Sequence, residues 1–132
     1  MSEIASYPSL NDKVVLITGG ASSIGETIVE NFLQQESKVI FFDKEKELGL
    51  KLVSRLKNYK YKAIFKECDL INIDDLKSKI NEIRKEVGLI SILINNAASD
   101  ERHDIDSVTP EYWDNRMNVN LRHYFFTIQS VY

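Results

Sequence analysis

The residues in this sequence best suited to chemistry are two glycines and an aspartate placed around short apolar runs. Gly19 and Gly25 lie in a turn that begins at Thr18, and Asp43 ends the next apolar run. A glycine turn that leads into a helix exposes unpaired backbone amides at the positive end of the helix dipole, and such a site binds anions. An acidic residue at the end of the next strand can accept ribose hydroxyls, so the two features together predict a dinucleotide site.

Four strands and four helices are predicted to position these residues. Apolar runs typical of strands cover residues 14–17, 38–43, 62–67 and 89–94. Apolar residues at helical spacing predict helices after Gly25, within roughly 44–58, from Asn72 to Gly88 and after Thr109-Pro110. This alternation predicts an α/β fold: a Rossmann-like doubly wound parallel sheet, truncated to four strands in the order 3-2-1-4 with four helices. We expect residues 1–132 to form a single partial dinucleotide-binding domain.

Composition and charge narrow the class of protein. The net charge of −3 and the pI near 5.4 provide no basic field, so nucleic acid is not expected as a partner. The single cysteine, Cys68, excludes an internal disulfide and is expected to be a small core residue, and no Cys/His cluster has metal-ligand spacing. Because the sequence has neither a leader pattern nor an apolar run of membrane length, we expect a cytoplasmic protein.

The residues at positions 23 and 43 each allow more than one interpretation. Ser23 stands where a glycine would let a pyrophosphate approach the backbone, and it also forms a predicted capping box with Glu26. Asp43 either binds ribose or is a solvated aspartate at the end of a strand. A carboxylate there repels a 2′-phosphate and the turn holds no arginine, so NAD is favoured over NADP, although neighbouring Lys44 leaves NADP open.

Further polar residues are expected near the same edge of the sheet. Asp69 is placed either to bond an adenine amino group or to form a turn. Asn95 and Asn96 are placed to tie neighbouring strands together by hydrogen bonds, and this structural role is enough to explain Asn95. The small side chains of Ala97 and Ala98 leave room for a ligand. Asn120 lies on an apolar helix face, where it is either satisfied within the core or holds a water or a backbone group.

Histidines and aromatic residues are expected in ordinary structural roles. Both histidines, His103 and His123, are expected at the surface or in loops. Four aromatic residues of the last helix are expected to serve core or interface packing rather than base stacking: Trp113, Tyr124, Phe125 and Phe126.

Motifs along essentially the whole chain resemble those of the short-chain dehydrogenase/reductase family. They are Thr18-Gly19-x-x-x-Ser23-x-Gly25, Asp43, Cys68-Asp69-Leu70, Asn95-Asn96-Ala97-Ala98 and Val119-Asn120-Leu121. Four further sequence segments resemble those of one subgroup of this family, the NAD-dependent sugar 1-dehydrogenases of the D-xylose 1-dehydrogenase type. These segments are Tyr7-Pro8-Ser9-Leu10, Ser99-Asp100-Glu101-Arg102-His103, Tyr112-Trp113-Asp114 and Asn118-Val119-Asn120-Leu121-Arg122-His123.

The resemblance implies an oxidoreductase that moves a hydride from a sugar or another alcohol to NAD. It assigns cofactor contacts to Gly19, Ser23, Ile24, Gly25, Asp43, Asp69, Leu70, Asn96, Ala97 and Ala98. It also implies that the substrate pocket is shaped by Ser99, Asp100 and His103. Of the family's catalytic residues only Asn120 has a match, because the chain contains neither the expected serine nor a Tyr-x-x-x-Lys, and Tyr132 does not fit the base.

Without these residues, we expect the chain to be inactive by itself. Two alternatives are a non-catalytic NAD-binding remnant and an interaction partner of a full-length dehydrogenase. The fourth strand is expected to be a bare sheet edge, and the last helix is expected to expose its aromatic side. We therefore expect the isolated chain to be marginally stable or to self-associate.

Overall fold

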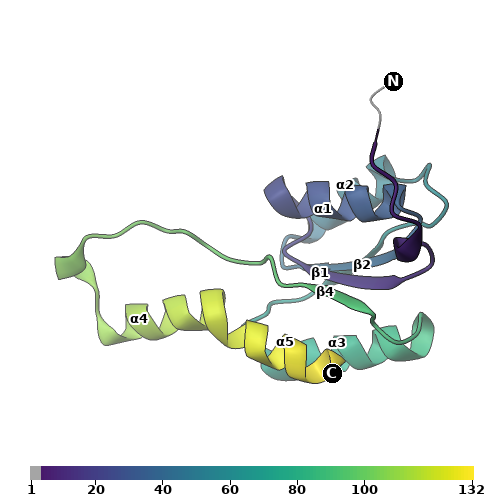
Figure 1. The fold of residues 1–132 in the computed structure, drawn as a ribbon. Coiled ribbons are helices and arrows are strands. Elements are labelled where there is room, and N and C mark those ends of the chain that lie inside the picture. Colours follow the sequence, from purple (N-terminus) through teal and green to yellow (C-terminus); the bar gives the residue numbers. More distant parts are fainter. Residues whose placement is uncertain (1–3) are drawn as a thin grey trace.

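The computed structural model describes residues 4–132 and contains a sheet of four parallel strands (Figure 1). The strands are β1 (Val14–Thr18), β2 (Lys38–Asp43), β3 (Ile64–Glu67) and β4 (Ile92–Ile94). Their order, β3-β2-β1-β4, confirms the predicted one. Residues 1–3 of the predicted domain lie outside the described range.

The strands β3 and β4 are shorter than the predicted runs 62–67 and 89–94. Both lie at edges of the sheet, where each pairs with one neighbour only. In register, Ile17 of β1 lies between Phe41 of β2 and Ile94 of β4, so the carboxyl ends of these strands meet at one edge.

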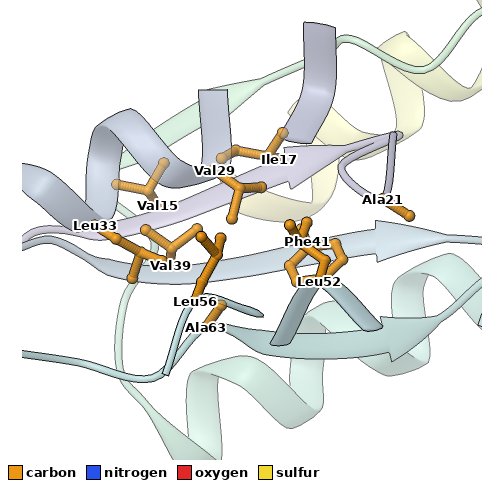
Figure 2. Packing of buried hydrophobic residues seen from close by; sticks show 10 residues of the cluster. All are labelled: Val15, Ile17, Ala21, Val29, Leu33, Val39, Phe41, Leu52, Leu56 and Ala63. Carbon is orange, nitrogen blue, oxygen red and sulfur yellow. The ribbon is translucent and has the colours of Figure 1, made fainter. Parts of the chain in front are cut away.

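Helices cover both faces of the sheet. On one face lie α1 (Ser23–Gln34) and α2 (Lys46–Arg55), and on the other lie α3 (Ile73–Glu86) and α5 (His123–Val131) (Figure 1). Because successive strand side chains point to opposite faces, Val15 and Ile17 pack under α1 while Leu16 packs with the α3 side. Figure 2 shows the first of these two clusters, in which strand residues meet side chains of α1 and α2.

The predicted fourth helix is a helical run with three parts. It begins as α4 (Pro110–Met117), continues as the π-helical segment η3 (Asn118–Arg122), and ends as α5. The Thr109 hydroxyl accepts the Tyr112 amide at 3.1 Å, as an N-cap should. Within this widened part of the run, the His123 ring bonds the Val119 carbonyl at 2.7 Å. Short 3₁₀ turns are η1 (Pro8–Leu10) and η2 (Ile105–Ser107).

One side of this helical run is apolar and exposed, as expected. Exposed residues follow one another at a spacing of three or four, and together we call them the apolar stripe: Trp113, Met117, Leu121, Phe125, Ile128 and Tyr132. Core packing is therefore the wrong role for Trp113 and Phe125, whereas Phe126 packs beside the α3 cluster. No helix among residues 4–132 has the length and apolar character needed to cross a membrane.

Cys68 follows β3 and is buried, which confirms its predicted place in the core. Burial raises the pKa of its thiol to about 12. The thiol therefore stays protonated at neutral pH and acts as a small apolar side chain.

Candidate cofactor site

The carboxyl ends of the strands open onto a cavity of about 590 Å³, a size typical of small-molecule sites. Every residue predicted to contact a cofactor lines it: Gly19, Ser23, Ile24, Gly25, Asp43, Asp69, Leu70, Asn96, Ala97 and Ala98. Of the predicted substrate residues, Ser99 and Asp100 line the cavity. His103 lies in the exposed loop beyond them, where its Nδ1 is 3.1 Å from the Tyr112 hydroxyl.

The turn between β1 and α1 is tight, and both of its predicted glycines are needed for it. Gly19 has φ +66°, a conformation that side chains disfavour, and its amide donates to the Phe42 carbonyl at 2.8 Å. A Cβ at Gly25 would lie 1.8 Å from the Gly19 carbonyl oxygen. No other residue fits at Gly25 without opening the turn.

The predicted capping box of Ser23 and Glu26 is wrong. The N-cap of α1 is Ser22, whose side chain makes no capping bond, and Ser23 is the first helical residue with φ +52°. Glu26 lies 3.6 Å from Arg55 of α2 instead, because it faces the neighbouring helix. The amides at the start of α1 are thus free of a side-chain cap beside the cavity.

Four hydrogen bonds join the end of β1 to the segment after β4, and we call them the Thr18–Asn96 knot. The Thr18 hydroxyl accepts the backbone amides of Asn96 at 3.0 Å and Ala97 at 3.1 Å. The Asn96 side-chain amide donates to the carbonyls of Thr18 and Gly19 at 3.1 and 3.0 Å. The strand-tying role therefore belongs to Asn96 and not to Asn95, whose Oδ1 is buried without a partner among residues 4–132.

Asp43 ends β2, is half-buried, and uses both carboxylate oxygens to bond the backbone. Its Oδ2 accepts the Ala21 amide at 3.1 Å, and its Oδ1 accepts the Glu45 amide at 3.0 Å. Each oxygen keeps a second lone pair for a ligand hydroxyl. The carboxylate thus holds the glycine turn against β2 and still presents acceptors to the cavity.

Asp69 forms a turn, since its Oδ1 accepts the Ile71 amide at 3.2 Å. It also lines the cavity, as do Glu45 and Asp100, while Lys44 is the basic residue among the lining. The surroundings of the cavity are therefore mainly acidic.

Asn120 binds a backbone group, one of the two roles predicted for it. Its Oδ1 accepts the Ser99 amide at 2.7 Å, and its Nδ2 donates to the Ser99 carbonyl at 3.0 Å. The Asn120 side chain therefore holds the backbone at Ser99, in the segment that follows β4.

His123 is fully buried, so the expectation of a surface or loop histidine is wrong for it and right for His103. Burial lowers the pKa of His123, and its Nδ1 is enclosed without a partner among residues 4–132. Sequence reasoning missed it as a lining residue, together with Ser22, Glu45 and Val119. Glu45 was detectable, because it follows Asp43 at a strand end; His123 was not, since its position depends on the π-helical segment.

Comparisons with known proteins agree with this geometry. The family described as "short chain dehydrogenase" matches residues 13–132, and the chain belongs to that family. The chain is 42% identical over 127 residues to the D-xylose 1-dehydrogenase of Caulobacter vibrioides, covering 96% of this chain and 50% of the relative. It is 39% identical over 126 residues to a protein of Rhizobium meliloti named a probable galactose dehydrogenase, covering 95% and 49%.

A solved structure is also similar. The ligand-free aldohexose dehydrogenase of Thermoplasma acidophilum superposes with a TM-score of 0.79 at 35% identity, covering 95% of this chain and 45% of that one. The chain spans about half the length of the curated relatives it matches.

Removing the acceptor at the centre of the Thr18–Asn96 knot should destabilise the fold. Thr18→Val keeps the shape but leaves two amide donors without their acceptor. We expect the free energy of unfolding in urea to fall by about 2 kcal/mol. The control is Thr27→Val, whose hydroxyl is exposed and makes one long bond of 3.4 Å. Equal effects of the two substitutions would contradict a special role for the knot.

Burial of His123 should make stability depend on pH. The lowered pKa means that the unfolded chain binds a proton near pH 6.5 that the folded chain does not. Stability should therefore fall as pH decreases below about 6.5, with a slope of up to about 1.4 kcal/mol per pH unit. Urea unfolding at pH 5 to 7 should show this slope in the native chain and in His103→Gln, but a shallower one in His123→Gln. An unchanged slope in the last variant would mean that other groups titrate.

Proposed function

We propose that these residues form the NAD-binding half of a dehydrogenase that oxidises an alcohol, with a sugar as its substrate class. The observation that supports this most is the convergence of one strand-end aspartate, one glycine turn and one uncapped helix start on the same cavity. The substrate class rests on the names of the relatives, a D-xylose 1-dehydrogenase, a probable galactose dehydrogenase and an aldohexose dehydrogenase. The composition and the single cysteine favour a cytoplasmic location.

The residues present fit such a dinucleotide. The amides at the start of α1 suit the charge of a pyrophosphate, and Asp43 offers free lone pairs to ribose hydroxyls. The small Ala97 and Ala98 leave the wall beyond β4 open. Because the carboxylates of Asp43 and Glu45 outnumber the one cation, Lys44, where β2 ends at the cavity, a 2′-phosphate is disfavoured and NAD is preferred over NADP.

The chemistry assigned to this chain is binding and orientation. NAD, when bound, supplies the acceptor for the hydride of the alcohol. Beyond its bonds to Ser99, the Asn120 side chain retains one N–H and one lone pair. We therefore assign to Asn120 the role of orienting a water molecule through which the proton of the alcohol leaves. No residue of the chain matches the family's serine and Tyr-x-x-x-Lys, and we expect the chain alone to bind NAD without forming NADH from a sugar.

Asp43→Ala tests the cofactor assignment. In calorimetric titrations of the 132-residue chain, NAD⁺ should bind more tightly than NADP⁺. The substitution removes hydrogen bonds to a charged acceptor, so NAD⁺ affinity should fall about tenfold or more. NADP⁺ affinity should fall less or rise, because the repulsion of its extra phosphate is removed.

Two other results are decisive for this assignment. Equal losses for both nucleotides would reduce Asp43 to a support of the glycine turn. NADH formation with D-xylose by the chain alone would overturn the expectation of inactivity.

The apolar stripe favours association as a second property. We expect it to pair with another copy of this chain or with a full-length relative, since a continuous exposed apolar surface of this kind commonly marks an interface. Phe125→Glu places a charge in its middle and should shift the chain toward monomer in sedimentation equilibrium. Ile105→Glu is the control, because Ile105 is 88% exposed in the loop away from the stripe. A native chain that is monomeric at all concentrations would contradict this expectation.

A further inference from the structure

The segment that follows the cavity wall is fastened to one face of the helical run. Three helix residues spaced by four hold alternate residues of the segment, in antiparallel order. The contacts are Asn120 with Ser99, Arg116 with Glu101 and Ser99, and Tyr112 with His103. We call this arrangement the clamp. In Figure 1 the helical run lies under the long arc of chain that leaves β4, which is the segment concerned.

Arg116 is the centre of the clamp. Its Nη1 lies 2.7 Å from Glu101 Oε2, and its Nη2 donates to the Ser99 carbonyl at 3.0 Å. Its side chain is 15% exposed although it is charged, so the guanidinium is committed to these partners. The Ser99 carbonyl also accepts from Asn120, which leaves this peptide group held from two helix turns.

Tyr112 supports Arg116 from the next turn of the helix. The guanidinium carbon of Arg116 lies 5.9 Å from the centre of the Tyr112 ring, within the range of a cation–π contact. The Tyr112 hydroxyl in turn lies 3.1 Å from His103 Nδ1. Arginine suits this place because its planar fork serves a carboxylate and a carbonyl together, which a lysine ammonium does less well.

The clamp affects the cavity because the held segment forms part of its wall. Ser99 and Asp100 line the cavity, while Glu101 is drawn to the helix. The strand order places β4 on the opposite side of β1 from β2 and β3. A dinucleotide with its adenosine at Asp43 and its pyrophosphate at the glycine turn therefore extends its nicotinamide half toward this wall.

We propose that Arg116 is a positioning residue that, through the Ser99 carbonyl and Glu101, holds Ser99 and Asp100 in place as the wall for the nicotinamide half of the cofactor. This inference rests on the proposed NAD-binding function. Arg116 itself does not line the cavity, so it acts through Ser99 and Glu101.

The experiment compares two ligands and one amide proton in the 132-residue chain. Arg116→Ala should weaken NAD⁺ binding about tenfold, the effect of losing hydrogen bonds to a charged group, and should leave the affinity for ADP-ribose within twofold. ADP-ribose lacks nicotinamide, so it reports on the half of the site that the clamp does not touch. Hydrogen exchange of the Ser99 amide, which donates to Asn120, should accelerate at least about tenfold.

Three further variants distinguish a loss of the Arg116 contacts from a general effect on folding. Arg116→Lys should recover part of the NAD⁺ affinity, because it keeps a cation near Glu101. Glu101→Gln should weaken NAD⁺ in the same direction with a smaller risk to folding. Arg122→Ala is the matched control, since Arg122 lies on the same helical run against Phe126 and makes no contact with the segment among those described.

The outcomes separate this inference from the proposed function. Equal loss of NAD⁺ and ADP-ribose in Arg116→Ala, or loss of neither, overturns the positioning role. If the native chain binds neither ligand, the proposed function fails and the nicotinamide assignment fails with it. Ser99 exchange then still decides whether Arg116 holds the wall: an unchanged rate in Arg116→Ala overturns the clamp.

Discussion

The Thr18 hydroxyl is the group on which the arrangement of the site depends. It lies at the end of β1, the strand between β2 and β4, and it accepts two backbone amides from the chain that leaves β4. Asn96 returns two bonds to the backbone of the turn. Displacement of this buried strand end is costly, because each displaced amide would lose its hydrogen-bond acceptor at a place where water cannot replace it. The glycine turn and the wall beyond β4 are thereby fixed relative to each other.

A second constraint comes from Asp43, which serves the fold and the cavity with the same two oxygens. Its bonds to the amides of Ala21 and Glu45 fasten the glycine turn to β2. A group that is already oriented by the backbone loses little freedom when a ligand hydroxyl arrives. The carboxylate that faces the cavity is thus one that the fold must hold in place in any case.

The helical run from Pro110 to Val131 extends these constraints to the far side of the cavity. Two sets of its residues lie on different faces: Arg116 and Asn120 contact the segment after β4, while the apolar stripe faces outward. The π-helical segment between α4 and α5 sets the rotation of one part against the other, and it places His123 beneath the cavity wall. A regular helix would have shifted the residues on one side of this segment by part of a turn.

The sequence alone determined the strand order, the glycine turn and the place of Asp43, because each follows from local periodicity and from the rule that parallel strands end at one edge. The family resemblance added the predicted cofactor contacts, all of which line the cavity, whereas His123 and Val119 were identified as lining residues only in the structure. Only the tertiary structure decided that Asn96 rather than Asn95 ties the strands, since adjacent asparagines differ in nothing but the direction that their strand imposes. The same holds for Glu26, which turned to Arg55 instead of capping a helix, and for Arg116, whose partners are 15 and 17 residues away. Polar side chains have several acceptable partners along the chain, and packing between distant elements selects among them.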